Sequence, residues 1–552
     1  MATPMLPQIS LGRSFALFTS AFAAWSLAGP AQAAPVAPNI IVIMADDAGL
    51  GDISAYRDFA LEYAQTPAID SLAETGLIST EAYTPAPMCW PTRGSLLTGR
   101  WPARWGNSPN VSDQYPRLGK LLQDAGYFTM MIGKTHNGVG EGDMPPTAWG
   151  WNRYFATFTQ HDYFMTYAGP GLGEQKFTNA VGFGASLNNP TSSNRLEPVV
   201  IDEETGRYTE QGWLTREGWS DIESWREDAV PGILTIPYEW ALRYGPVLEG
   251  RDQEPFEFVT DLGSYTINNP YEKREMQAGY LPQKFNEKGV EYVTEHLEEN
   301  PDQPFFLYMP RSIPHVPVHA PPRELLRPER QELLGQQGDF AQRALVMDMV
   351  DQGVGDLVKL LKDKGIYENT IIIFCSDNGG NEAAMGKLRG RKGQLFEGGI
   401  RTPFVMSWPA GIPEDQHGSQ SAIPITLMDL APTFLSAAAA ETTTEFDGVD
   451  LLANWQGKTD AAPERFADAL FWGDGNKKKY AVNQTVRSAD GEVQHRWKLV
   501  RQGGEEYLFD LKVDEFEENN LDNPEMRNHM RELVNAWLEQ MGKSDRLEVD
   551  AQ

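Results

Sequence analysis

One cysteine lies in a setting that is unusual for a structural residue. The stretch PMCWPTRGSLLTGR, which begins at Pro87, places Cys89 between two prolines and four residues before Arg93. A cysteine that only packs behaves as a small hydrophobe in an apolar run, as Cys375 does in TIIIFC. These are the only two cysteines of the chain, and a disulfide between them would consume Cys89. We therefore interpret Cys89 as a reactive group.

Four oxygen-bearing side chains follow two strand-like runs. Asp46 and Asp47 come after NIIVIM, and Asp377 and Asn378 come after TIIIFCS. Three of the four side chains are anionic, a set that suits a hard divalent cation such as Ca²⁺ or Mg²⁺. Each pair alone is more typical of a surface turn. Together, at the ends of two buried strands, the pairs favour a metal site.

Cationic and imidazole side chains follow similar runs. Lys134 and His136 come after GYFTMMIG, His315 lies between prolines in RSIPHVPVHAP with His319 as a near-equal competitor, and Lys392 lies in the glycine-rich LRGRKGQLFEGGIRTP. Each residue alone is typical of a solvated loop. Beside a cation, they suit an oxyanion ester as substrate, because cation and lysines stabilise charge on the transferring oxygens while a histidine serves the leaving group.

The runs that precede these residues have the length and composition of buried strands. NIIVIM, GYFTMMIG, PFFLYM, TIIIFCS and TPFVMSW follow one another along the chain. Helical patterns between or after them cover residues 67–75, 117–124, 340–364 and 426–437. This alternation predicts an α/β domain with a largely parallel sheet. Ligands of such sheets bind beyond the carboxyl ends of the strands, so the polar residues are expected to converge on one site.

The chain divides into regions of different composition. Residues 1–34 are predicted to be a secretion signal, with Arg13 before an apolar run at 14–27 and an A-x-A site ending at Ala33. That run is shorter than the roughly 20 apolar residues of a spanning helix, so we expect an exported protein, periplasmic or secreted. Residues 35–445 form the predicted catalytic domain, in which the stretch from about 160 to 300 is interpreted as loops over the site. Residues 446–552 predict a small antiparallel α+β domain with a closing helix at 524–541.

The net charge of the chain bears on which binding partners are expected. The formal net charge is −30, from 77 acidic and 47 basic residues. Binding to nucleic acid or to an anionic membrane depends on clustered Lys and Arg, and the composition argues against both partners. A site that is locally positive can still bind an anion on an acidic surface.

The motifs together resemble those of a known family. The run C-x-P-x-R at Cys89, Pro91 and Arg93, followed by GSLLTGR, resembles the modification motif of the type I sulfatases, members of the alkaline phosphatase superfamily. The DD pair, GK-x-H, PH-x-P, DNGG and RKGQLFEGGIRTP blocks occur in that family's order. The resemblance implies an alkaline-phosphatase-like sandwich, with a large central, mostly parallel sheet flanked by helices and a smaller C-terminal antiparallel sheet packed with a helix.

The resemblance implies a function for the C-x-P-x-R motif at Cys89. In that family the cysteine is oxidised by a separate formylglycine-generating enzyme, which would be a partner during maturation, and the resulting aldehyde hydrates to a gem-diol. Cys89 would be the precursor, and Arg93 would orient the hydrated aldehyde. Thr92 stands where Ser or Ala is common, and Trp90 is bulky beside the residue to be modified.

The remaining matched positions imply a ligand set and an acid–base pair. Carried over by position, Asp46, Asp47, Asp377 and Asn378 would bind the cation, Lys134 and Lys392 would hold sulfate oxygens, His136 would take the proton of the second hydroxyl, and His315 would assist departure of the alcohol. The implied activity is sulfuric ester hydrolysis, with Ca²⁺ or Mg²⁺ as the cation.

The substrate is expected to be a sulfated saccharide or an aryl sulfate. Aromatic residues cluster in TAWGWNRYFATFTQHDYF, and aromatic faces suit sugar rings, although such clusters are more often core. Arg153, His161 and Asp162 are candidate substrate contacts. Asn110 and Asn483 begin N-x-Ser/Thr sequons, which matter only in a eukaryotic secretory pathway. Nothing in the sequence fixes the oligomeric state.

Two alternatives stay open at this stage. A phosphonate monoester or phosphodiester hydrolase of the same superfamily can use formylglycine and a divalent cation. A non-catalytic protein that binds sulfated glycans is the alternative from another class, although no motif residue is missing.

Overall fold

The computed structural model describes most of the chain from residue 37 onward. The described residues are 37–105, 111, 114–136, 149–157, 281–315, 321, 325–333, 339–473, 478–543 and 547, together with the backbone of short strands between 201 and 268. The predicted signal and most of the stretch from 160 to 300 lie outside them. Residues from Ala37 onward belong to one compact unit. Among the described helices, none has the length and apolar character needed to cross a membrane.

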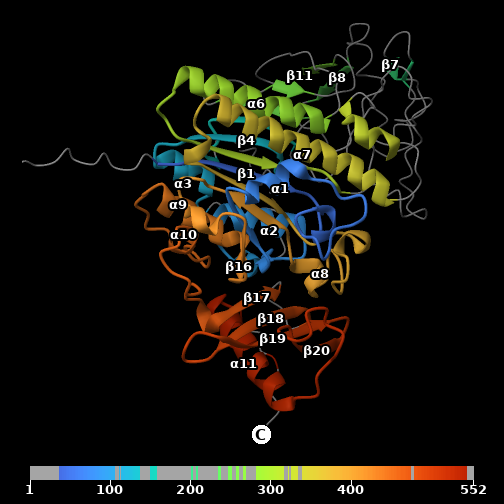
Figure 1. The fold of residues 1–552 in the computed structure, drawn as a ribbon, viewed down its shortest axis with the longest axis vertical. Coiled ribbons are helices and arrows are strands. Elements are labelled where there is room, and N and C mark those ends of the chain that lie inside the picture. Colours follow the sequence, from blue (N-terminus) through green and yellow to red (C-terminus); the bar gives the residue numbers. More distant parts are fainter. Residues whose placement is uncertain are drawn as a thin grey trace, which may run out of the picture. The chain divides into compact units, whose positions relative to one another are not determined.

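A mixed sheet of ten described strands forms the centre of this unit (Figure 1). In spatial order the strands are β10 (Glu257–Val259), β9 (Val247–Arg251), β5 (Arg153–Thr157), β4 (Phe128–Lys134), β12 (Phe305–Pro310), β1 (Asn39–Ala45), β13 (Thr370–Ser376), β14 (Phe404–Ser407), β2 (Gly76–Ser79) and β15 (Ser419–Ser421). The five strands from β5 to β13 run parallel, whereas β9 and β14 are antiparallel to their inner neighbours. The predicted large, mostly parallel sheet is confirmed.

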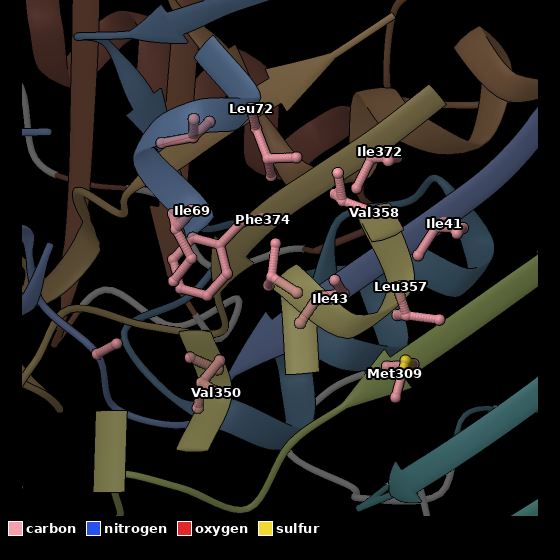
Figure 2. Close-up of a cluster of buried hydrophobic side chains, with 14 of the residues drawn as sticks. Ile41, Ile43, Ile69, Leu72, Met309, Val350, Leu357, Val358, Ile372 and Phe374 are labelled. Atoms are coloured by element: carbon pink, nitrogen blue, oxygen red, sulfur yellow. The ribbon is translucent and has the colours of Figure 1, made fainter. Parts of the chain in front are cut away.

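Apolar side chains bury both faces of this sheet. Along β1, Ile40 and Val42 point into one core, and Ile41 and Ile43 point into the other, as the period of two in a strand requires. The first core is covered by α2 (Cys89–Thr98), α3 (Leu118–Asp124), α9 (Leu430–Ala437) and α10 (Leu452–Trp455), and the second by α1 (Pro67–Ala73), α6 (Leu281–Glu299) and α7 (Asp339–Asp363). Figure 2 shows strand side chains of the second core meeting those of α1 and α7. Burial on both faces explains why the strands read as continuous apolar runs.

A short helix sets the position of Cys89. Met88, in extended conformation, precedes α2, and Cys89 is its first residue. The helix ends at Gly99, whose φ of 65° is left-handed and suits a C-terminal cap. A Cβ at Gly99 would lie 2.4 Å from the ring of Phe446, so glycine is required on both counts. The cap and the proline-bounded start hold α2 at a fixed place on the sheet.

A second, smaller sheet closes the chain. Its antiparallel strands are β17 (Ala469–Gly473), β18 (Tyr480–Arg487), β19 (Val493–Gln502) and β20 (Glu505–Asp510), and α11 (Pro524–Gln540) packs on it. Asn523 caps α11 by accepting a hydrogen bond from Met526 N at 3.0 Å. The predicted C-terminal antiparallel sheet with a closing helix is therefore present, while the boundary between residues 445 and 446 stays a prediction.

Short elements complete the described chain. Two-stranded pairings join β3 (Ala82–Tyr83) with β16 (Ile425–Thr426), β6 (Ile201–Asp202) with β7 (Arg207–Tyr208), and β8 (Leu234–Pro237) with β11 (Tyr265–Asn268). The helix α8 (Glu397–Ile400) follows the loop that contains Lys392.

A buried carboxylate in α7 predicts a pH-dependent stability. Asp351 accepts a hydrogen bond from Ile69 N at 2.9 Å, and burial raises the pKa of this carboxyl to about 7. Because the folded pKa exceeds the unfolded value of 3.8, the stabilising contribution is complete below pH 3.8 and is lost as the pH rises toward 7. The free energy of unfolding of Asp351→Asn lacks this pH dependence. The difference in unfolding free energy between Asp351→Asn and the wild type should therefore shift in favour of the variant from pH 5 to pH 8, by on the order of 2 kcal/mol. Denaturant unfolding of both proteins at pH 5 and at pH 8 measures this shift. The same difference in unfolding free energy at the two pH values would contradict the prediction.

Candidate active site

Several of the side chains predicted to form the site gather at one edge of the central sheet. Asp46 and Asp47 follow β1, Asp377 and Asn378 follow β13, and Lys134 ends β4. Ala45 and Ser376 are register partners in the parallel pair β1–β13, so the two acidic pairs leave the sheet side by side. The carboxyl ends of parallel strands thus bring together residues that are about 330 positions apart, as their hydrogen bonds confirm.

The four oxygen-bearing residues form a connected and fully buried group. Asn378 Nδ2 donates to Asp47 Oδ1 at 2.8 Å, and Asp47 N donates to Asp377 Oδ1 at 3.2 Å. Asp46 Oδ1 and Asn378 Oδ1 are buried and have no hydrogen-bond partner. Buried polar oxygens are normally satisfied, and two orphaned oxygens beside other carboxylates fit the ligand set of a hard cation. A divalent cation would be held by Asp46, Asp47, Asp377 and Asn378.

Burial and neighbouring charges shift the pKa values of the Asp46 and Asp377 carboxyls. Burial alone would raise the pKa of Asp46, but Lys134, His315 and Arg93 outweigh it and hold the pKa well below its usual value. Burial and the neighbouring Asp46 carboxylate raise the pKa of Asp377 to about 7 in spite of Arg93. A bound cation would favour the ionised form of each carboxyl.

Arg93 connects three elements from within the protein. Its side chain is fully buried, and its Nε and Nη2 donate to Asp377 Oδ2 at 2.8 and 2.6 Å. Its other donors reach the carbonyl oxygens of Lys134, at 2.8 Å, and Arg311, at 3.1 Å. One guanidinium therefore fixes the Asp377 carboxylate and the ends of β4 and β12 relative to α2.

Two lysines pair with different carboxylates of the acidic group. Lys134 Nζ pairs with Asp46 Oδ2, and Lys392 Nζ lies 2.6 Å from Asp47 Oδ1. With Arg93, these two ammonium groups balance the three carboxylates. A divalent cation would then leave the site with two positive charges, a balance that favours an anionic ligand.

Cys89 lies beside the carboxylates at the start of α2. Its Sγ and one carboxylate oxygen each of Asp46 and Asp377 lie within 4.8 Å of one another. The side chain is buried, and burial raises the pKa of the thiol although Lys134 and Lys392 oppose the shift. The unmodified residue is thus a thiol near neutral pH, and a thiol is a weak nucleophile.

Two histidines lie close to this group. His136 follows Lys134 in a left-handed conformation with a φ of 49°, and burial and the nearby Lys134 hold its pKa well below the usual value. His315 Nε2 lies 3.6 Å from Asp47 Oδ2, and burial lowers its pKa although Asp47 opposes the shift. Both imidazoles are therefore neutral near pH 7, the form that can accept a proton.

Two family models match this chain. The profile described as Sulfatase matches residues 38–440, which include every residue of the site named above. The chain belongs to the sulfatase family. It is therefore a sulfatase, a hydrolase of sulfate esters. A second profile, N-sulphoglucosamine sulphohydrolase, C-terminal, matches residues 391–544 of this sulfatase.

Relatives of the sulfatase cover most of its length. It is 27% identical to the N-acetylgalactosamine-6-O-sulfatase of Bacteroides thetaiotaomicron, over 90% of this chain and 93% of that protein. It is 28% identical to human arylsulfatase A, over 77% of this chain and 68% of that protein.

Solved structures confirm the fold. A sulfatase from Pseudoalteromonas sp. matches with a TM-score of 0.61 and 22% identity, over 93% of this chain and 92% of that one. The phosphonate monoester hydrolase of Agrobacterium radiobacter matches with a TM-score of 0.51 and 18% identity, over 92% and 95%.

One predicted contact of the sulfatase lies away from the site. Arg153 begins β5 opposite Met130, whereas the site lies at the other end of the neighbouring β4, at Lys134. The Arg153 guanidinium pairs with Glu295 and Glu291 of α6 and lies over a tyrosine ring. Arg153 therefore packs a helix onto the sheet, at the start of a strand whose neighbour carries the site at its other end, and its role as a substrate contact stays a prediction.

The other predicted substrate contacts, the competing histidine and one sequon lie outside the described residues, and the second sequon lies in a strand. His161, Asp162, His319 and Asn110 lie outside the described residues. Asn483 is described, and it is buried in β18, where the folded protein would not expose it as a glycosylation acceptor.

Sequence reasoning missed an arginine that supports the site. Arg343 of α7 donates to Asp47 O at 2.9 Å and to Pro314 O at 3.2 Å, and it pairs with Asp52 at 2.6 Å. It thereby ties the backbone of Asp47 to the segment just before His315. The signal in the sequence is a basic residue within the apolar pattern FAQRALVMDMV.

Proposed function

We propose that this sulfatase releases inorganic sulfate from a sulfated saccharide, using a formylglycine formed from Cys89 and a bound Ca²⁺, with Mg²⁺ as the alternative ion. The observation that carries the proposal is the position of Cys89 Sγ among the carboxylate oxygens of Asp46 and Asp377. A side chain that must attack a sulfate ester beside a cation would have to lie there.

The acidic group supplies the binding site for the cation. The cation, held by Asp46, Asp47, Asp377 and Asn378, would supply Lewis-acid polarisation of a sulfate oxygen. Arg93 holds Asp377 in place through two hydrogen bonds. Lys134 and Lys392 would bind the remaining sulfate oxygens, a role supported by the pairing of their ammonium groups with Asp46 and Asp47 of this group.

The modified residue explains how turnover is completed. A cysteine that attacked sulfate would be left as a stable thiosulfate ester, whereas a hydrated aldehyde can attack with one hydroxyl and expel sulfate through the other. His315 would assist departure of the alcohol, and His136, which is neutral near pH 7, would take the proton of the second hydroxyl. Positioned acid–base groups of this kind typically contribute about 10²–10⁴-fold each.

The relatives support a saccharide as the substrate class. The Bacteroides thetaiotaomicron relative is named for action on N-acetylgalactosamine 6-sulfate, and it aligns with 90% of this chain. Residues 1–34 carry the pattern of a secretion signal, which suits an exported enzyme that meets extracellular or periplasmic saccharides. Modification by a formylglycine-generating enzyme before or during export completes the proposal.

Paired substrates test the proposed activity. Protein co-produced with a formylglycine-generating enzyme should release sulfate from an aryl sulfate and from N-acetylgalactosamine 6-sulfate, with a much lower rate on a matched aryl phosphonate monoester. Faster release from the phosphonate would instead support the phosphonate hydrolase. Tight binding of sulfated glycan without any sulfate release would support a binding protein.

A further inference from the structure

The loop that bears Lys392, residues 389–397, lies against two segments of the active site. Lys392 N donates to Gly380 O at 3.0 Å, just beyond the metal-site residue Asn378, and Gly393 N donates to Pro87 O at 2.7 Å, just before Cys89. The Lys392 ammonium then reaches Asp47. These contacts define one side of what we name the Lys392 loop.

The Lys392 loop is held internally by hydrogen bonds from Gln394 N to Arg391 O at 2.9 Å and from Gly398 N to Arg389 O at 2.7 Å. It contains no helix or strand before α8 begins at Glu397. Gly390 and Gly393, on either side of Lys392, have φ values of 83° and 82°. Glycine at both positions makes the segment permissive rather than stiff. Contacts from outside the loop add to its internal hydrogen bonds in fixing the position of the long lysine side chain.

The small C-terminal sheet supplies such contacts on the other side of the loop. Lys479, just before β18, donates to Gly393 O. Gln502, the last residue of β19, accepts a hydrogen bond from Leu395 N at 2.8 Å through its side-chain oxygen. The backbone of the Lys392 loop is thus bonded on one side to the active site and on the other to the C-terminal sheet.

A buried charge group anchors the end of the loop. Lys498 of β19 is fully buried between Glu397 Oε1 at 2.6 Å and Glu517 Oε1 at 2.8 Å, and Glu517 Oε2 accepts from Glu397 N at 2.7 Å. Arg389, at the start of the loop, donates to Glu517 O at 2.9 Å. Glu517 has a φ of 58°, a strained conformation for a side-chain-bearing residue that persists only where the surroundings impose it. Both ends of the Lys392 loop are therefore tied to one buried point.

We propose that the C-terminal sheet belongs to the active-site machinery, with Lys479 and Gln502 as positioning residues that hold the Lys392 loop so that Lys392 faces the sulfate. The inference rests on the proposed function, because it takes Lys392 as a group that binds sulfate. It assigns to a region outside the central sheet a role in the reaction rather than in stability alone.

A double variant tests the proposal with a matched control. Lys479→Ala with Gln502→Ala removes both hydrogen bonds to the loop but leaves the buried Lys498 group in place. The control, Gln484→Ala with Lys512→Ala, also removes one glutamine and one lysine from the C-terminal part, where these side chains bond to Ala467, His529 and Val493 instead. The test variant should lose about tenfold in kcat/KM, as expected if two hydrogen bonds position one substrate-binding group. The control should keep the wild-type value.

Two further readouts separate positioning from stability. In a Lys392→Ala background the test variant should cause no additional loss, because the group it positions is already gone. Hydrogen–deuterium exchange should rise in peptides from residues 389–397 of the test variant and stay unchanged in the control. An additional loss in the Lys392→Ala background, or full activity with unchanged exchange, would overturn the positioning role.

The outcomes also distinguish this inference from the proposed function. If Lys392→Ala is impaired but the test variant is fully active, the positioning role fails and the site assignment stands. If Lys392→Ala has full activity, Lys392 has no part in sulfate binding. The positioning role and the assignment of Lys392 to the site then both fail.

Discussion

Cys89→Ala is expected to abolish sulfate release while the protein remains folded. Residue 89 is the precursor of the proposed nucleophile, and removal of a covalent nucleophile typically costs on the order of 10⁴–10⁶-fold in kcat. Cys89 lies among polar groups of the site and belongs to none of the apolar clusters of the core, so its removal leaves no apolar cavity. Steady-state release of sulfate from an aryl sulfate, compared with the melting curve, measures both parts of the expectation.

The second cysteine provides the control. Cys375 of β13 is fully buried in the core cluster that covers one face of the sheet. Cys375→Ala should lower stability, by about 1–2 kcal/mol for a small core truncation, and leave kcat close to the wild-type value. Retention of activity by Cys89→Ala, or equal losses of activity in the two variants, would contradict the assignment of the nucleophile.

Removal of the cation is expected to have the second large effect. A chelator should reduce sulfate release by about 10³-fold or more, because the polarising charge and the alignment of the sulfate oxygens are lost together. The melting temperature should fall as well, since Asp46, Asp47 and Asp377 would face one another without their cation. A ligand present at 100 times its Kd stabilises the folded state by about 2.7 kcal/mol. Titration with Ca²⁺ and with Mg²⁺ after chelation should restore both properties and rank the two ions.

A buried carboxylate outside the site serves as the matched variant. Asp429 is fully buried and paired with Arg465 at 2.6 Å, far in sequence from the metal ligands. Asp429→Asn should lower stability but keep the response to the chelator, whereas Asp46→Asn should lose activity and lose that response. A wild-type enzyme that works at full rate after exhaustive chelation would contradict a metal-dependent mechanism.

The central sheet and its acidic edge could be predicted because their signals are local. A buried parallel strand is an apolar run, and Asp46 and Asp377 each follow such a run directly. Parallel pairing of β1 with β13 then brings the two carboxylates together without further information. The same logic placed Lys134 at the end of β4.

The supporting contacts could not be predicted because they depend on tertiary packing. Arg343 reaches the site only because α7 crosses the second core beside β1, and nothing in its own segment specifies that partner. Lys498 and Glu517 meet Glu397 across more than 100 residues, through the docking of the C-terminal sheet. Arg153 is a further case, since its aromatic segment suggested the rim of the site, whereas its place at the start of β5 and its pairing with α6 depend on tertiary packing.

The mass of the tryptic peptide that spans residues 58–93 tests the central claim most directly. It should be measured on active protein co-produced with a formylglycine-generating enzyme. The account predicts that the −CH₂SH group of Cys89 is replaced by −CHO or its hydrate, in a fraction that rises in step with the specific activity. An active enzyme in which residue 89 is uniformly an unmodified cysteine would contradict it.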